Sequence, residues 1–202
     1  STLFPYTTLF RSARFGAGVM TISRFDEQTG MLARRAAQEF IDKQVKGVVL
    51  DLRDNGGGYL TAAQALASVW LNDQVVVTEK TGGKVVDTVK TERHALLGDI
   101  KTVVLTNGNT ASASEIVAGA LQEYGKATLI GEKTYGKGTV QKIVNLSDGR
   151  ILKVTTARWY TPKGKNITKE GITPDKTTHI TKDDANAGKD TQMEAAQSVL
   201  AS

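Results

Sequence analysis

The chain of 202 residues contains no cysteine and only two histidines, His94 and His179. The absence of cysteine excludes disulfides, thiolate metal ligands and a cysteine nucleophile. Two histidines leave few ways to build a Ser-His-Asp site. Neither histidine lies at metal-ligand spacing from another ligand residue, so we predict no metal site. No apolar run approaches the ~18 residues that would indicate a membrane span.

Charge and composition are ordinary for a globular protein of one medium domain. Hydrophobic residues make up 40% of the chain and charged residues 23%, and the net charge is +5. The basic residues are scattered among acidic ones rather than gathered in a stripe, so we predict no nucleic-acid partner.

The first twelve residues differ from the remainder of the chain. Residues 2–12, TLFPYTTLFRS, read like the translation of a common DNA-sequencing adapter, and they lack the charge and apolar core of a signal peptide. The alternative is a native, flexible N-terminal segment. We expect residues 1–12 to be non-native, residues 13–180 to form the core, and residues 181–202 to form a polar tail with a short C-terminal helix.

Apolar periodicity predicts alternating strands and helices in the core. Strands are expected at 19–25, 48–50, 75–78, 84–88, 102–105, 127–130, 140–146 and 151–157, and helices at 30–44, 60–70 and 113–124. The turn sequences Thr81-Gly82-Gly83 and Ser147-Asp148-Gly149 indicate hairpins, and Gly47 is expected to end the first helix. The alternation predicts an α/β fold with a largely parallel central sheet plus antiparallel hairpins. The loops 56–58 and 107–112 then lie at the carboxyl ends of strands, where functional loops gather.

Ser112 is the candidate nucleophile, because it stands between a turn and a predicted helix. The N–H of Ala113 is unpaired in such a position and can bind an oxyanion, and Gly57 or Gly58 can supply a second donor. Ser112 and Glu115 also have the S-x-x-E spacing of a capping box, a helix start without catalytic meaning. Taken alone, this segment favours the cap.

Lys137 is the candidate base, because it follows Ser112 by 25 residues and is flanked by two glycines. A lysine that acts as a base must be neutral, and Gln141, four residues later, can hydrogen-bond a neutral amine without restoring its charge. The alternative is a solvated lysine in a flexible hairpin.

A phosphate-binding loop is the rival interpretation of the same segment. Residues 131–137, GEKTYGK, match G-x-x-x-x-G-K, but Gly138 stands where a serine or threonine must bind magnesium. The residues that follow predict a strand rather than a helix. We therefore predict no nucleotide partner.

Several segments in register resemble the C-terminal processing peptidases, also called tail-specific proteases. These segments are VVLDLRDNGGG at 48–58, NGNTASASEIVAGAL at 107–121, GEKTYGKGTVQ at 131–141, TTARWYTPKG at 155–164 and GITPD at 171–175. The resemblance covers about residues 17–175.

The resemblance implies a crotonase/Clp-protease-like fold and a Ser-Lys peptidase. It implies that Ser112 is the nucleophile, Lys137 the general base and Gln141 its partner, with Ala113, Gly57 and Gly58 forming the oxyanion hole. It further implies polypeptide substrates with exposed C-termini, no cofactor, and a location in the periplasm or cell envelope of a bacterium, with membrane association through an upstream region left open.

The sequence departs from the family pattern in three places. Gly56 replaces the proline usual before the paired glycines, and Glu123 stands where some relatives have an aspartate. The adapter-like stretch stands where the family normally has a PDZ domain, which captures a substrate's C-terminus by strand addition. The alternative function is a non-catalytic peptide- or ligand-binding module of the same fold.

Overall fold

The computed structural model describes residues 9–12, 16–146 and 150–202, which form two sheets and five helices within these ranges. The helices are α1 (Thr29–Asp42), α2 (Leu60–Ala67), α3 (Ala113–Glu123), α4 (Lys182–Asn186) and α5 (Thr191–Ala201). The strands are β1 (Leu9–Ser12), β2 (Ala17–Thr21), β3 (Gly47–Asp51), β4 (Val75–Thr81), β5 (Lys84–Lys90), β6 (Thr102–Thr106), β7 (Thr128–Gly131), β8 (Thr139–Asn145), β9 (Ile151–Tyr160) and β10 (Lys176–Thr177).

The central sheet has the order β1-β2-β3-β6-β7-β10 and is parallel except for β1, which runs antiparallel to β2. Strands β3 and β6 lie at its centre, and all five residues of each are buried. Strands buried on both faces of a parallel sheet read as continuous apolar runs. The predicted α/β class with a largely parallel sheet is therefore confirmed.

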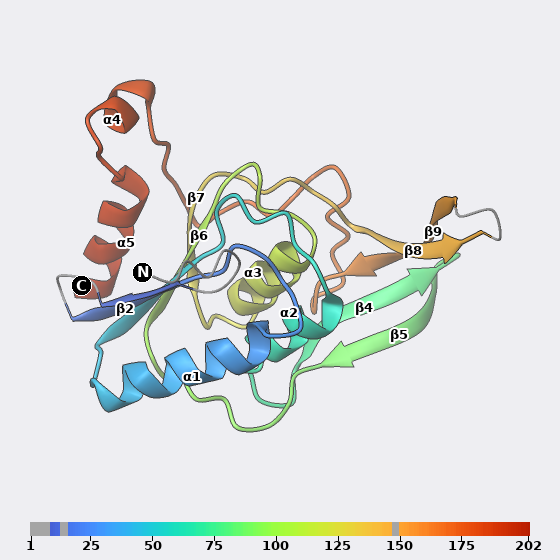
Figure 1. Ribbon diagram of the computed structural model, residues 1–202, viewed down its shortest axis with the longest axis horizontal. Helices are drawn as coiled ribbons and strands as arrows, with labels where there is room; N and C mark the ends of the chain where they lie inside the picture. The colour runs from blue at the N-terminus through green and yellow to red at the C-terminus, as the bar shows by residue number, and fades with distance from the viewer. Residues whose placement is uncertain (1–8, 13–15, 147–149) are drawn as a thin grey trace.

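Helices cover both faces of this sheet (Figure 1). Helices α1, α2 and α3 pack against one face, where Val48, Leu50 and Val104 point into the main core. Helix α5 packs against the other face, where Val49, Val103 and Leu105 meet Ala196. The alternation of side chains along β3 and β6 explains how adjacent residues supply two separate cores.

The second sheet is antiparallel, has the order β5-β4-β9-β8 and extends away from the helices (Figure 1). Gly82 and Gly83 join β4 to β5 with φ angles of 57° and 81°. Positive φ at both central residues is the geometry of a two-residue hairpin turn that only glycine adopts easily. The predicted hairpin at this position is confirmed, whereas the turn predicted at 147–149 lies outside the described residues.

Several predicted boundaries differ from the structure. Helix α1 ends at Asp42, and Gln44, with φ 53°, makes the left-handed turn expected of Gly47. Gly47 instead opens β3, where a Cβ atom would lie 2.8 Å from the Leu200 side chain. Residues 9–12, which we set aside as non-native, form the edge strand β1; their pairing says nothing of their origin. No helix in the described ranges is both long and apolar enough to cross a membrane.

Candidate active site

Ser112 stands at the N-terminus of α3 with a strained backbone, φ 58° and ψ −118°. This combination is costly for a residue with a Cβ atom and is typical of functional positions held by their surroundings. Ser112 and Glu115 are arranged as a capping box in which Glu115 accepts from the Ser112 N–H, but no helix N–H reaches the Ser112 hydroxyl with hydrogen-bond geometry. The Glu115 N–H donates to the Ser112 carbonyl at 2.9 Å instead, which leaves the hydroxyl available.

Glu115 is fully buried and holds the Ser112 and Lys137 segments together. Its Oε2 accepts hydrogen bonds from the backbone N–H of Ser112 at 2.8 Å and of Lys137 at 2.9 Å. Its Oε1 accepts from the Thr134 hydroxyl at 2.5 Å and from the Gly136 N–H at 2.7 Å. A buried carboxylate with four donors is well satisfied, and it fixes the two candidate catalytic segments relative to each other.

Close packing around Lys137 explains the glycines that flank it. A Cβ atom on Gly136 would lie 2.8 Å from the backbone N of Gly171, and one on Gly138 would lie 2.6 Å from the Thr168 hydroxyl. The Lys137 carbonyl accepts from Trp159 Nε1 at 2.8 Å. The backbone of this segment is thus fixed on both sides, while the lysine side chain faces the cavity that Ser112 lines.

Gln141 lies on β8, just after a register shift in the pairing of β8 with β9. An irregularity of this kind re-aims side chains, and both Val140 and Gln141 line the cavity with Ser112 and Lys137. No hydrogen bond joins the Ser112 hydroxyl to the Lys137 amine, both of which are described. Catalytic hydrogen bonds are often long without substrate.

The loop from Asn55 to Gly58 lies directly against the Ser112 turn. The Gly57 N–H donates to Asn55 Oδ1 at 2.8 Å, while Asn55 itself is buried and donates to the Ile22 carbonyl at 2.6 Å. In contrast, no acceptor for the N–H of Gly58 or Ala113 is found among the described residues. Both line the cavity, so two free N–H donors lie close to the serine.

Gly57 and Gly58 have no room for side chains. A Cβ atom on Gly57, at φ 98°, would lie 2.8 Å from both the Ala111 carbonyl oxygen and Ser112 Cβ, and one on Gly58 would lie 2.0 Å from the Phe25 carbonyl oxygen. Gly56 differs, because a Cβ atom there would meet nothing within 4 Å. The sequence requirement for glycine is therefore strict at two of the three positions.

The cavity has a volume of about 340 Å³ and lies between the antiparallel sheet and the starts of α2 and α3, which supply most of its apolar side chains. Its lining includes Leu60, Val77, Ile116, Val140 and Trp159. Glu79 also lines it, and burial together with the charge of Asp87, its cross-strand partner, raises the pKa of the Glu79 carboxyl. The described residues contain no group of three or more histidines, aspartates and glutamates that could hold a metal ion.

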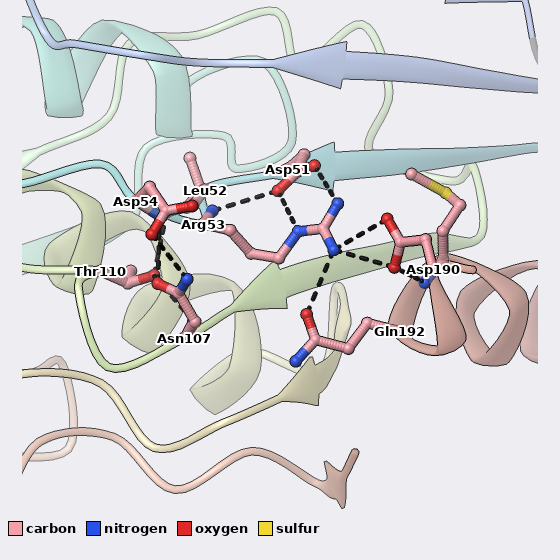
Figure 2. A network of polar contacts seen from close by, with 9 residues as sticks. Asp51, Leu52, Arg53, Asp54, Asn107, Thr110, Asp190 and Gln192 are labelled. Atoms are coloured by element: carbon pink, nitrogen blue, oxygen red, sulfur yellow. Dashed lines mark hydrogen bonds and ion pairs between the residues drawn. The ribbon is translucent and has the colours of Figure 1, made fainter. Parts of the chain in front are cut away.

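Asp54, which has φ 58°, joins the glycine-rich loop to the turn before α3 (Figure 2). Its Oδ1 accepts from the side-chain amides of Asn107 at 2.9 Å and Asn109 at 2.8 Å. The hydrogen bonds from Asn109 and then Asn107 lower the pKa of the Asp54 carboxyl. These contacts join the loops that follow β3 and β6.

Glu115 and Asn55 are site residues that the sequence reasoning missed. The S-x-x-E pattern predicts the local bond from Ser112 but carries no sign of Thr134, Gly136 or Lys137. The structure does place all six predicted residues, Ser112, Ala113, Lys137, Gln141, Gly57 and Gly58, around one site. Their catalytic roles remain predictions.

Glu123, the second departure from the family pattern, lies in the last turn of α3. Its carboxylate accepts from the Thr161 hydroxyl at 2.6 Å and from the Lys163 N–H at 2.7 Å. It anchors the loop after β9 and does not line the cavity.

Comparison with known proteins identifies the family to which the chain is related. The family model for peptidase family S41 matches residues 16–178. The carboxy-terminal-processing protease of Bartonella bacilliformis is 42% identical over 166 residues, covering 78% of this chain and 38% of that protein. A probable CtpA-like serine protease of Staphylococcus epidermidis is 38% identical over 160 residues, covering 78% of this chain and 33% of that protein.

Solved structures extend the agreement to the fold. The photosystem II D1 C-terminal processing protease superposes with a TM-score of 0.80 at 32% identity, covering 100% of this chain and 54% of that one. The chain spans about a third of the length of the curated relatives it matches. The predicted resemblance is confirmed, and the chain belongs to peptidase family S41.

Proposed function

We propose that the chain is the catalytic core of a serine peptidase that cleaves polypeptides at or near their C-termini by a Ser-Lys mechanism. The observation that carries this proposal is the strained Ser112 turn, which shares one cavity with Lys137 and with the N–H groups of Ala113 and Gly58, neither of which finds an acceptor in the described part of the chain. The names of the relatives, which describe C-terminal processing and serine proteases, support the same class of activity.

In the proposed reaction, Ser112 Oγ attacks the carbonyl carbon of the scissile peptide bond and passes its proton to the neutral amine of Lys137. The oxyanion that forms is bound by the N–H groups of Ala113 and Gly58, which need no reorganisation. Lys137 then gives the proton to the leaving amine, and the C–N bond breaks to leave an acyl-enzyme. A water molecule, deprotonated by Lys137, releases the acyl group and regenerates Ser112.

Within this scheme, Gly58 is the better second oxyanion donor and Gly57 acts through its shape. The Gly57 N–H is already bound to Asn55 Oδ1, whereas that of Gly58 has no acceptor among the described residues. Gln141 is proposed to orient the Lys137 amine, supported by its position on the lining of the same cavity.

We further propose that substrates are unstructured polypeptides with exposed C-termini and that the protein acts in the periplasm or cell envelope. A recognition module beyond the catalytic core is proposed because the relatives are about three times as long as the matched segment.

The decisive experiment compares Ser112→Ala and Lys137→Ala with the parent on an unstructured protein substrate. Both variants should lose at least about 10³-fold in kcat, as expected for members of one catalytic unit. Lys133→Ala, which removes an exposed lysine four residues earlier, serves as the matched control and should keep full activity.

Labelling with a fluorophosphonate probe separates a peptidase from a binding module of the same fold. The parent should label at Ser112, and Lys137→Ala should label far more slowly. A parent that binds peptide but neither labels nor cleaves would establish the binding module and reject the peptidase.

A further inference from the structure

Helix α5 is joined to the end of β3 by a polar network centred on Arg53 (Figure 2). Arg53 Nη1 donates to Asp190 Oδ1 at 3.0 Å and to Gln192 Oε1 at 3.2 Å. Asp190 is the N-cap residue of α5, and its Oδ1 also accepts from the Met193 N–H at 2.9 Å. The guanidinium therefore binds the first turn of the C-terminal helix.

The other side of the guanidinium binds the strand that leads into the active site. Arg53 Nε and Nη2 form a bidentate pair with Asp51 at 2.9 and 2.7 Å, and the Arg53 backbone N–H donates to the same carboxylate at 3.1 Å. Burial alone would lower the pKa of Arg53, but Asp51 and then Asp190 raise it above its ordinary value. The network is thus held by a permanent charge.

The glycine-rich loop continues directly from this anchor. Arg53 is followed by Asp54, which has a positive φ, and then by buried Asn55, whose side chain accepts from the Gly57 N–H. Gly57 has no free space against Ser112. A shift of the loop at Arg53 would therefore move Gly57 and Gly58 relative to Ser112.

Gln192 is a buried polar residue in the first turn of α5, and both the oxygen and the nitrogen of its side-chain amide form hydrogen bonds. Only 2% of Gln192 is exposed, and its Nε2 donates to the Thr178 carbonyl at 2.8 Å while its Oε1 accepts from Arg53. The later turns of α5 pack through Ala196, Val199 and Leu200. Apolar residues would pack equally well at this first turn. A fully hydrogen-bonded polar network instead fixes where the turn lies relative to Arg53.

We propose that the first turn of α5 acts through Arg53 to hold the loop from Asn55 to Gly58 in its working position. Asp190 and Gln192 are then positioning residues for the peptidase reaction. This inference rests on the proposed function of the site. Both residues lie beyond residue 178, where the match to the family model ends, so the match assigns them no role.

The test is the double variant Asp190→Asn with Gln192→Met, compared with the parent chain. Asparagine is as good an N-cap as aspartate, and methionine is close to glutamine in size, so α5 should stay docked while its bonds to Arg53 weaken. The control is Glu194→Gln on the same helix, which removes an exposed ion pair with Lys189 in the turn before α5.

We expect kcat on a peptide substrate, and the rate of Ser112 labelling by a fluorophosphonate, to fall about tenfold in the double variant. KM should change less than about twofold, because the loop acts on the transition state rather than on the bound substrate. Measurements are made well below the unfolding temperature of each protein. If the double variant does not fold, Asp190→Asn alone should show a threefold or larger fall in kcat, and its KM should again change less than about twofold.

An active parent with unchanged kcat in the variant would overturn the positioning role and leave the proposed function intact. A loss of activity that only follows the unfolded fraction, or that falls on KM, would also overturn it. An inert parent would instead reject the proposed function itself, and this inference with it.

Discussion

Replacing Glu115 with glutamine perturbs the contact that joins the two candidate catalytic segments. The change keeps the size of the side chain but turns one acceptor oxygen into an NH₂ donor. Oε2 accepts from the N–H groups of Ser112 and Lys137, and Oε1 accepts from Gly136 N–H and the Thr134 hydroxyl. Either orientation of the glutamine therefore sets its NH₂ against existing donors.

The less costly orientation points the NH₂ group toward Thr134 and Gly136. The Thr134 hydroxyl, which already accepts from the Ile172 N–H, can also accept from the NH₂ group, but its own hydrogen and the Gly136 N–H are then left without acceptors, at ~1–3 kcal/mol each. The two bonds kept by Ser112 and Lys137 lose their charged acceptor, which lowers their combined contribution by roughly 1–2 kcal/mol. We expect Glu115→Gln to reduce the free energy of unfolding by about 3–8 kcal/mol, a large share of a typical total.

Urea unfolding of parent and variant, followed by kcat measured where both are folded, checks this prediction. The folded variant should lose about tenfold in kcat, because a displaced Gly136 moves Lys137. Glu123→Gln is a matched control at the other end of the same helix, where the carboxylate also accepts two hydrogen bonds; it should cost about 1 kcal/mol and leave kcat unchanged. A Glu115→Gln variant within about 0.5 kcal/mol of the parent would refute the reasoning, since buried unsatisfied groups are costly.

Three other predictions follow from the same structure. Gly57→Ala should lower the rate of Ser112 labelling at least about 100-fold, because Gly57 has φ 98° and its new Cβ atom would clash with Ser112 Cβ. Gly56→Ala, with open space around it, should instead stabilise the fold by ~0.4–1 kcal/mol. Equal effects of the two substitutions would contradict the packing argument. The raised pKa of Glu79 means that the folded state binds its proton more tightly, so stability falls as pH rises from the unfolded to the folded pKa. Glu79→Gln should therefore gain a small, solvent-screened amount of stability over the parent as pH rises through the titration of this carboxyl. A gap in melting temperature between the two proteins that does not change with pH would refute this. Because the pKa of Asp54 is lowered in the folded state, its carboxylate stabilises the fold above the unfolded pKa, and this stabilisation is lost as pH falls through the folded pKa. Asp54→Asn should therefore reduce the fall in melting temperature at acid pH by a small, solvent-screened amount.

The architecture could be predicted from sequence wherever a strong period or turn signal existed. The apolar runs that became β3 and β6, and the Gly82-Gly83 turn, have direct physical signatures. Strand β10 was missed, because two residues carry no period. A short C-terminal helix was predicted within a polar tail, but its packing against the sheet was not, since that packing relies on a few apolar residues and on the buried polar side chain of Gln192.

The candidate site could be predicted in its members but not in its internal contacts. Ser112 and the 56–58 loop meet because β3 and β6 are parallel neighbours, so the loops at their carboxyl ends adjoin. The long-range bonds of Glu115, however, depend on where the Lys137 segment folds back, and no local pattern records that. The same holds for Asn55, whose side chain takes the Gly57 N–H that sequence reasoning left free for an oxyanion.

The strained conformation of Ser112 is held from two sides, and this accounts for the arrangement of the whole site. Glu115 fixes the Ser112 N–H from within the helix, while Gly57 fills the space against Ser112 Cβ from the neighbouring loop. A backbone cost of ~1–3 kcal/mol at one residue persists only where the surroundings fix it in this way. The Ala111 N–H and the Ser114 hydroxyl both donate to the Asn55 carbonyl, at 3.0 and 2.9 Å, and so bind the two sides to each other. Loosening either side should therefore relax Ser112, and the serine and its oxyanion donors would lose their alignment together.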